Sequence, residues 1–210
     1  MALSRQDIAR AGLRLLNDVG LNGLTLRLIA QELGVKAPAL YWHLKNKQEL
    51  LDEMATQMYR DRDDLFDAPV KGGDWAEDLA ARARGFRRMM LAYRDGAKVF
   101  AGTFLTDIVT PNENVYKFLI GEGFDPHRVG RITFTLFTYV IGFTIEEQAV
   151  YPRPGELDER YRERVDTLAE RIDAPVLAAL TSSLPVGDPD QQFEDGLEIV
   201  LTGMRAWLTR

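Results

Sequence analysis

Tyr41, Trp42 and His43 stand side by side, and each combines a ring with an O–H or N–H donor. We expect them on a short helix, which cannot bury two large rings and an imidazole at once. A Tyr-Trp pair usually belongs to a core, but here part of the cluster must face outward. Phenol, indole and imidazole groups all donate hydrogen bonds to nucleic-acid phosphates. The cluster therefore predicts a phosphate-binding surface.

A metal site is the competing chemistry for His43, because imidazole is a common metal ligand. The only other histidine is His127, far along the chain, and the sequence contains no cysteine. A tight site needs several such ligands close together. We therefore expect no metal site and no cofactor.

Two short helices are expected to position this cluster. Thr25 can cap a helix over residues 26–33, which Gly34 would end. A second, very short helix starts near Ala37, with Pro38 in its first turn. This is the pattern of a helix-turn-helix, whose second helix can enter a DNA major groove. The residues expected to join the helices are Ile29, Ala30, Leu33, Val35 and Leu40, and those expected outside are Arg27, Lys36, Ala37, Pro38, Ala39, Tyr41, Trp42 and His43.

The charge distribution separates this region from the rest of the chain. Residues 1–47 contain seven Lys or Arg against three Asp or Glu, whereas residues 48–210 contain 19 against 29. A basic segment attracts a polyanion, and an acidic remainder is repelled by it. The pattern indicates that only the N-terminal segment meets DNA.

The remaining sequence predicts helices throughout. Segments with period-two alternation are absent, whereas capping residues followed by helical apolar spacing recur. We expect an all-α protein, with an N-terminal three-helix domain that carries the helix-turn-helix (residues 1–46) and a larger helical domain (residues 47–210). The expected helices outside the helix-turn-helix cover residues 4–20, 47–65 (connecting the domains), 75–93, 126–149, 156–172, 175–182 and 189–208, with a further start at Pro111.

Composition excludes several classes of protein. The lack of cysteine excludes a disulfide framework, the charges in residues 1–20 exclude a signal peptide, and the apolar stretch 134–143 is too short to span a membrane. We expect a soluble cytoplasmic protein with no membrane partner. We also expect no enzyme, because the sequence offers no nucleophile elbow, phosphate loop or histidine–carboxylate set. Glu146 and Glu147 have no partner base and are expected on a solvated face.

Residues 24–47, which include LYWHLKNK, and the following LLDEMA closely resemble the DNA-binding domain of the TetR family. The resemblance continues in residues 86–103, FRRMMLAYRDGAKVFAGT, which look like the family's segment between its ligand pocket and its DNA-binding head. Residues 142–148 and 193–208 resemble its dimerisation helices more loosely. The likeness covers most of the chain.

The resemblance assigns DNA contacts by position. It implies that Arg27 reads a base, since a guanidinium can take guanine O6 and N7 together, and that Lys36 contacts a base or a phosphate. It also implies that residues 37–39 face the bases. The implied phosphate contacts are Thr25, Tyr41, Trp42, His43 and Lys47.

The sequence departs from the family pattern where the operator is chosen. Ala37 replaces a base-reading glutamine, and Ala39 replaces a neighbouring threonine. Alanine can touch a thymine methyl group but cannot form a hydrogen bond with a base edge. We therefore expect an operator different from that of the family's founding member.

The resemblance also implies a small-molecule pocket in the larger domain. Its candidate wall residues are Asp63, Arg82, Phe86, Met90, Phe100, Thr103, Phe104, Ile108, Phe118, Phe134, Phe137, Ile141 and Glu146, with Glu147 as the alternative to Glu146. Any one of the aromatic residues could equally belong to ordinary core. Arg82 could pair with Asp63 or with an acidic group of a ligand.

The expected ligand differs from that of the founding member. The family's magnesium-binding histidine falls on Phe100, which has no lone pair for a cation. A magnesium–tetracycline chelate is therefore not expected. The abundance of Phe and Met favours an apolar or aromatic effector with few polar groups.

Together these features predict a ligand-responsive transcriptional repressor, released from its operator by a small-molecule effector. It would bind near-palindromic double-stranded DNA as a homodimer, paired through helices 126–149 and 189–208. The resemblance favours repression over activation. An effector-independent dimeric DNA-binding protein, whose larger domain only dimerises, stays open as the alternative.

Overall fold

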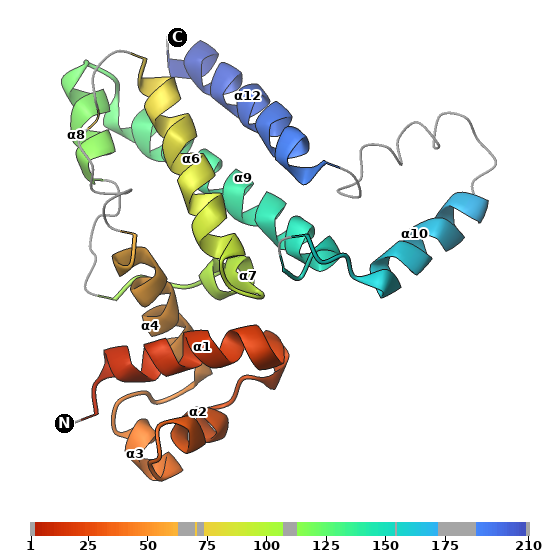
Figure 1. Ribbon diagram of the computed structural model, residues 1–210. Helices are drawn as coiled ribbons and strands as arrows, with labels where there is room; N and C mark the ends of the chain where they lie inside the picture. The colour runs from red at the N-terminus through yellow and green to blue at the C-terminus, as the bar shows by residue number, and fades with distance from the viewer. Residues whose placement is uncertain are drawn as a thin grey trace.

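The computed structural model of the chain describes residues 3–62, 70, 74–106, 113–153, 155–171 and 188–208, apart from the side chains of residues 168–171. Within these residues every regular element is a helix, and one isolated antiparallel bridge joins Arg153 to Glu156. The helices of Figure 1 are α1 (Arg5–Gly23), α2 (Leu26–Glu32), α3 (Ala37–Tyr41), α4 (Lys47–Arg60), α6 (Trp75–Leu91), α7 (Gly96–Phe100), α8 (Glu113–Gly121), α9 (Pro126–Val150), α10 (Glu159–Arg171) and α12 (Pro189–Leu208). The all-α expectation is confirmed.

The first three helices and the start of α4 gather at one end of the molecule, below α6 and α7 in Figure 1. We call this part the head and the helices from α6 to α12 the body. Polar caps start its two longer helices: Ser4 and Asp7 form a capping box on α1, and Asn46 accepts the Glu49 N–H at 2.9 Å on α4. The head is held together by fully buried side chains from all four helices, including Ile8, Leu16, Ile29, Leu40 and Leu50.

Helix α9 is the central helix of the body, since it packs against α6, α7, α8, α10 and α12. Asp125 caps it by accepting the Arg128 N–H at 3.0 Å, and Pro126 lies in its first turn, where a missing N–H costs nothing. Its buried residues recur every three or four positions, as an inward-facing helix requires, and include Val129, Ile132, Leu136 and Val140. None of the described helices has an apolar stretch long enough to cross a membrane.

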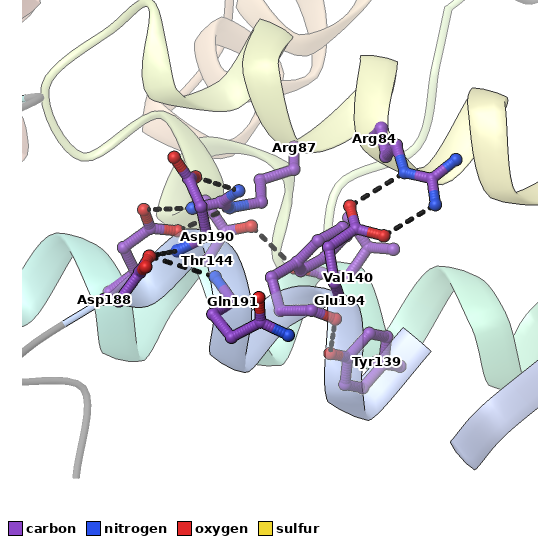
Figure 2. Close-up of polar contacts among 11 residues, drawn as sticks. Arg84, Arg87, Tyr139, Val140, Thr144, Asp188, Asp190, Gln191 and Glu194 are labelled. Carbon is purple, nitrogen blue, oxygen red and sulfur yellow. Dashed lines mark hydrogen bonds and ion pairs between the residues drawn. The ribbon is translucent and has the colours of Figure 1, made fainter. Parts of the chain in front are cut away.

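Two arginines of α6 bind carboxylates that come from α9 and α12 (Figure 2). Arg87 donates from Nε and Nη2 to both oxygens of Glu147, at 2.8 and 2.6 Å, and from Nη1 to Asp190 at 2.7 Å. Arg84 makes a second bidentate pair with Glu194, at 2.7 and 2.6 Å. These bonds fasten α12 and α9 to the same face of α6.

The Arg87–Glu147 pair is buried, with side chains 9% and 6% exposed. Burial alone would lower the pKa of Arg87, but its bonds to Glu147 and Asp190 outweigh that effect and raise it, so the guanidinium stays charged. The Phe193 ring covers the guanidinium at 4.8 Å. The expectation that both acids of the 146–147 pair face solvent is therefore wrong for Glu147, because its partner lies on another helix and no local pattern reveals it.

The helix bounds depart from expectation in a few places. Gly20 adopts φ 67° and ψ 173°, which breaks α1 there, but the chain resumes a helical course to Gly23. The charged helix begins at Glu159 rather than 156, and α7 was not expected as a separate helix. The helix expected over 47–65 ends earlier, at Arg60, with Asp61 as its C-cap. The expected helix 175–182 and the start at Pro111 lie outside the described residues.

Gly196 marks the point where α12 crosses close to α9. The Tyr139 hydroxyl donates to the Phe193 carbonyl at 2.7 Å, and a Cβ on Gly196 would lie 2.3 Å from that hydroxyl oxygen. Gly196→Ala must displace the ring, so we expect the free energy of unfolding, measured in urea, to fall by about 1–3 kcal/mol. Gly130→Ala on α9 is the control, because a Cβ there meets nothing within 4 Å. Equal losses in the two variants would contradict the close crossing.

Arg87→Met should be far more damaging than Arg84→Met. The first leaves Glu147 buried without a cation, and removal of one partner of a buried pair costs about 3–5 kcal/mol. The second opens a pair whose side chains are 42% and 40% exposed, and exposed pairs contribute about 1 kcal/mol or less. Adding Glu147→Leu to Arg87→Met should recover much of the loss in urea unfolding. Similar losses for the two single variants would argue against a buried pair.

Candidate DNA interface and effector cavity

The turn between α2 and α3 is closed by backbone hydrogen bonds. The Val35 N–H donates to the Ala30 carbonyl at 2.9 Å, and the Gly34 N–H donates to the Gln31 carbonyl at 3.1 Å. These are the paired bonds of a Schellman motif, and Gly34 supplies the positive φ, 65°, that the motif requires. The predicted helix-turn-helix is therefore present, with its turn at the expected residues.

Helix α3 turns most of its surface outward. Of its five residues only Leu40 is buried, and this side chain anchors the helix to the head. Tyr41 is 55% exposed, and Trp42, which follows the helix, is 90% exposed. His43 is half-buried. The reading of Tyr41 and Trp42 as ordinary core is thus wrong, and both rings present their donors to solvent.

The other predicted DNA contacts surround this helix. Arg27 on α2 and Lys36 at the start of α3 are exposed, as is Pro38, while residues 37 and 39 are half-buried. Thr25 caps α2, and its Oγ1 accepts a backbone N–H of that helix at 3.2 Å. Lys47 begins α4, and its ammonium group donates to the carbonyl of residue 21 at 2.9 Å. A phosphate bound by Lys47 would therefore share that ammonium group with α1.

A cavity of about 340 Å³ lies in the body among α6, α8, α9 and the segment that follows α7. Phe86 stacks on Phe137 with ring centroids 5.1 Å apart and meets Phe100 edge-on at 5.2 Å. Phe104 and Phe134 are 83% and 66% exposed, so part of the wall is open to solvent. The described wall consists of Tyr59, Leu79, Arg82, Ala83, Phe86, Phe100, Thr103, Phe104, Leu105, Val115, Tyr116, Thr133, Phe134, Leu136, Phe137 and Val140.

Several predicted wall residues lie elsewhere. Met90 is fully buried in the core beyond the cavity, and Ile141 is buried next to the wall residue Val140 without reaching the cavity. Glu146 is exposed on α9, and Phe118 is half-buried outside the wall. Asp63 and Ile108 lie outside the described residues. The predicted residues that the structure brings together are Arg82, Phe86, Phe100, Thr103, Phe104, Phe134 and Phe137.

Part of the wall was missed in the sequence. Leu79 and Ala83 precede Phe86 at helical spacing, so that spacing could have found them. Tyr116 and Thr133 meet only because α8 packs on α9, where the Thr133 hydroxyl donates to the Tyr116 hydroxyl at 3.1 Å. No local pattern could have revealed this polar pair.

Arg82 brings a positive charge to the described wall. Its side chain is 8% exposed, and its Nε donates to Asp78 at 2.7 Å. The described wall contains no carboxylate or imidazole, and no group of three or more His, Cys, Asp or Glu able to hold a metal occurs in the described part of the chain. A magnesium ion takes oxygen ligands. The described wall thus offers a magnesium ion hydroxyl oxygens but no carboxylate or imidazole.

The cavity wall is bonded to the helix that follows the DNA interface. The Phe104 N–H donates to Asp52 at 3.2 Å. Glu53, which is 4% exposed, accepts the Thr106 hydroxyl at 3.0 Å and pairs with Arg5 of α1 at 2.7 Å. Residues 102–106 thus contact α4, three of them line the cavity, and Glu53 links the segment to α1 through Arg5.

A helix-turn-helix with exposed aromatic donors, joined to a helical body with a cavity, defines a DNA-binding regulator of the helix-turn-helix class. Family comparison agrees in both parts. Residues 8–54 match the model of bacterial regulatory proteins of the tetR family, and residues 68–208 match the tetracyclin repressor-like C-terminal domain. The chain belongs to the TetR family.

Individual relatives match along almost the whole chain. The class G tetracycline repressor of Vibrio anguillarum is 37% identical over 205 residues, which cover 96% of this chain and 93% of the relative. A variant of TetR from Acinetobacter baumannii AYE in complex with minocycline superposes with a TM-score of 0.79 at 32% identity, covering 100% and 96% of the two chains. The TetR family protein ActR of Streptomyces coelicolor in complex with actinorhodin gives a TM-score of 0.78 at 28% identity, covering 99% and 98%.

Phe134→Ala should weaken binding of the fluorescent probe 8-anilinonaphthalene-1-sulfonate. Loss of one ring from an aromatic contact removes about 0.5–1.5 kcal/mol, which is roughly a twofold to twelvefold change in affinity. Ile120→Ala is the matched control, since Ile120 is 43% exposed on α8 and lies outside the wall. Fluorescence titration measures both. A probe that responds equally to the two substitutions does not bind in the cavity.

Proposed function

We propose that this protein is a transcriptional repressor that binds a near-palindromic operator as a homodimer and leaves it when a small molecule enters the cavity. The observation that carries the proposal is the set of bonds between residues 102–106 and α4. Thr103, Phe104 and Leu105 line the cavity, while Asp52 and Glu53 of α4 hold the same segment from the other side. A ligand that displaces this segment must also displace α4.

The DNA side of the proposal places α3 in the major groove. Arg27 reads a base, Lys36 contacts a base or a phosphate, and residues 37–39 face the base edges. Thr25, Tyr41, Trp42, His43 and Lys47 bind phosphates. The alanines at positions 37 and 39 favour thymine methyl groups, so the operator should be rich in A·T pairs under the start of α3.

The effector we propose is a planar aromatic molecule with few polar groups. In the wall, the Phe86 ring already contacts the rings of Phe100 and Phe137, and a flat ligand can pack against this aromatic group. Arg82 and the Tyr116–Thr133 pair are among the polar groups of the described wall that could orient it. A pocket of this kind gains affinity from buried apolar area and selectivity from a few polar contacts.

The dimer we propose pairs α9 and α12 of one chain with the same helices of the other. Ile199 on α12 is exposed in the single chain although it is apolar, which suits a surface covered by a partner. The two copies of α3 would then lie about 34–36 Å apart, in successive major grooves on one face of the DNA. Since tight binding needs both heads engaged, a shift of a few ångströms in their separation abolishes it.

Selection of bound DNA from a random pool by the purified protein tests this proposal. We expect a near-palindrome whose half-sites lie about one helical turn apart. The selected DNA should then be released when an aromatic ligand binds in the cavity. Lack of enrichment at low salt would refute DNA binding, whereas a palindrome that no cavity ligand releases would favour the effector-independent dimeric protein.

Arg27→Ala and Lys47→Ala should affect this binding in different ways. Loss of a base reader costs about 1–3 kcal/mol and relaxes selectivity at one base pair of each half-site. Loss of a phosphate contact weakens all sequences alike and lowers the slope of affinity against salt by about one. Titration of the selected operator and its single-base variants at several salt concentrations separates the two. Unchanged selectivity in Arg27→Ala would remove Arg27 as the base reader.

A further inference from the structure

The head is attached to the body at a second place, which precedes α7, whereas residues 102–106 follow that helix. The chain turns sharply at residues 93–96, between α6 and α7, and this turn binds the C-terminal part of α1. Asp95 accepts the Leu21 N–H at 3.0 Å, and the Arg94 N–H donates to the Asn17 side chain at 2.9 Å. Arg153, which follows α9, donates to the Asn17 carbonyl at 2.9 Å. We call these five bonded residues, Asn17, Leu21, Arg94, Asp95 and Arg153, the elbow clamp.

The break in α1 makes the clamp possible. The non-helical φ and ψ of Gly20 turn the chain so that the next N–H points at Asp95. Asp95 itself adopts the left-handed conformation with φ 56°, which aspartate tolerates better than most residues. Burial alone would raise the pKa of Asp95, but the hydrogen bond from Leu21 and the ammonium group of Lys98 lower this pKa by more than burial raises it. The carboxylate is therefore ionised at neutral pH. The clamp therefore contains a charge-assisted bond.

A buried glutamine of α9 binds the turn at residues 93–96, which we call the elbow. Gln148 is 4% exposed; its Nε2 donates to the Tyr93 carbonyl at 2.8 Å, and its Oε1 accepts the Ala97 N–H at 3.0 Å. One side chain thus satisfies backbone groups on both sides of the turn, at the end of α6 and the start of α7. Gly96 lies so close to the carbonyl of Met90 that a Cβ would come within 2.1 Å of its oxygen. The elbow consequently has little freedom to change shape.

The two attachments involve different residues. Gln148 and the residues of the elbow clamp are absent from the cavity wall, whereas residues 103–105 belong to it. A ligand in the cavity therefore contacts one attachment and leaves the other untouched. Two attachments on one rigid head restrict its tilt relative to the body more than either does alone.

We propose that the elbow clamp fixes the angle of the head on the body and thereby sets the half-site spacing that the dimer accepts, with Gln148 as its positioning residue. This inference rests on the proposed function, because it needs a dimer that reads two half-sites. Each added base pair moves one half-site by about 3.4 Å and rotates it by roughly 35° around the DNA axis. A rigid head tolerates neither change, whereas a head that rocks on α4 alone tolerates both.

The test measures affinity for operators built from the selected half-sites with the central spacer kept, shortened by one base pair or lengthened by one. For the unmodified protein we expect each altered spacer to weaken binding by about tenfold or more. Asn17→Ala removes one clamp bond near the surface, and Gln148→Leu removes the support behind it. In both variants the loss for altered spacers should shrink to about threefold or less.

Three further readouts separate positioning from general damage. The salt slope and the affinity for 8-anilinonaphthalene-1-sulfonate should stay those of the unmodified protein, because neither the phosphate contacts nor the cavity wall is changed. Asn22→Ala, an exposed substitution on the same helix, is the matched control and should keep the sharp spacing preference. Thermal unfolding checks that each variant folds. If Gln148→Leu does not fold, Asn17→Ala alone tests the proposal.

The outcomes distinguish this inference from the function on which it rests. A sharp spacing preference that persists in the clamp variants overturns the inference and leaves the repressor intact. A broad preference already present in the unmodified protein also overturns it. Failure of the unmodified protein to bind any selected operator overturns the proposed function and the inference together.

Discussion

Arg87 can remain charged inside the body only because its donors and one of its faces are occupied. Glu147 and Asp190 take its N–H groups, and the ring of Phe193 covers it. Without these partners, the buried guanidinium would lose its hydration and gain no hydrogen bonds or ion pairs in exchange. Any arrangement that misplaces α9 or α12 is therefore strongly disfavoured. The pair thus fixes the crossing of the body's main helices. The cavity and the elbow at the end of α6 are both formed by these helices, so their shapes depend on that crossing.

The head is attached to the body at two places, one that the cavity does not touch and one that the cavity touches. At the elbow, polar bonds run from α9 through the turn at residues 93–96 to α1, and the cavity does not touch them. At residues 102–106, the bonds to α4 come from the wall residue Phe104 and from Thr106 just beyond the wall. Under the proposed function, a small molecule would act on one end of the head while the other end serves as its pivot. A local displacement in the body would then become a rotation of α3.

Features that depend on neighbouring residues could be predicted from the sequence, and features that depend on distant ones could not. The caps at Ser4, Thr25 and Asn46 and the turn at Gly34 are local, so the helix-turn-helix and most helix bounds follow from them. The aromatic wall was found only in part, because spacing identifies a helix face but not what that face meets. Met90 was expected in the wall and lies in the core, while Tyr116 was missed since α8 reaches the cavity only by tertiary packing. The elbow escaped prediction for the same reason: Gln148, 51 residues beyond Ala97, makes the bonds that shape it.

The exposure of α3 has an evolutionary consequence. Only Leu40 of its five residues is buried, so most of the side chains proposed to meet DNA are distinct from the one that anchors the helix. Substitutions at the outward positions change the recognised sequence at little cost to stability. A duplicated copy of this gene could therefore acquire a new binding site by drift through folded intermediates, with its cavity and its pairing surface unchanged. Specificity for DNA and responsiveness to ligand can diverge at different rates in such a chain, because they draw on different residues.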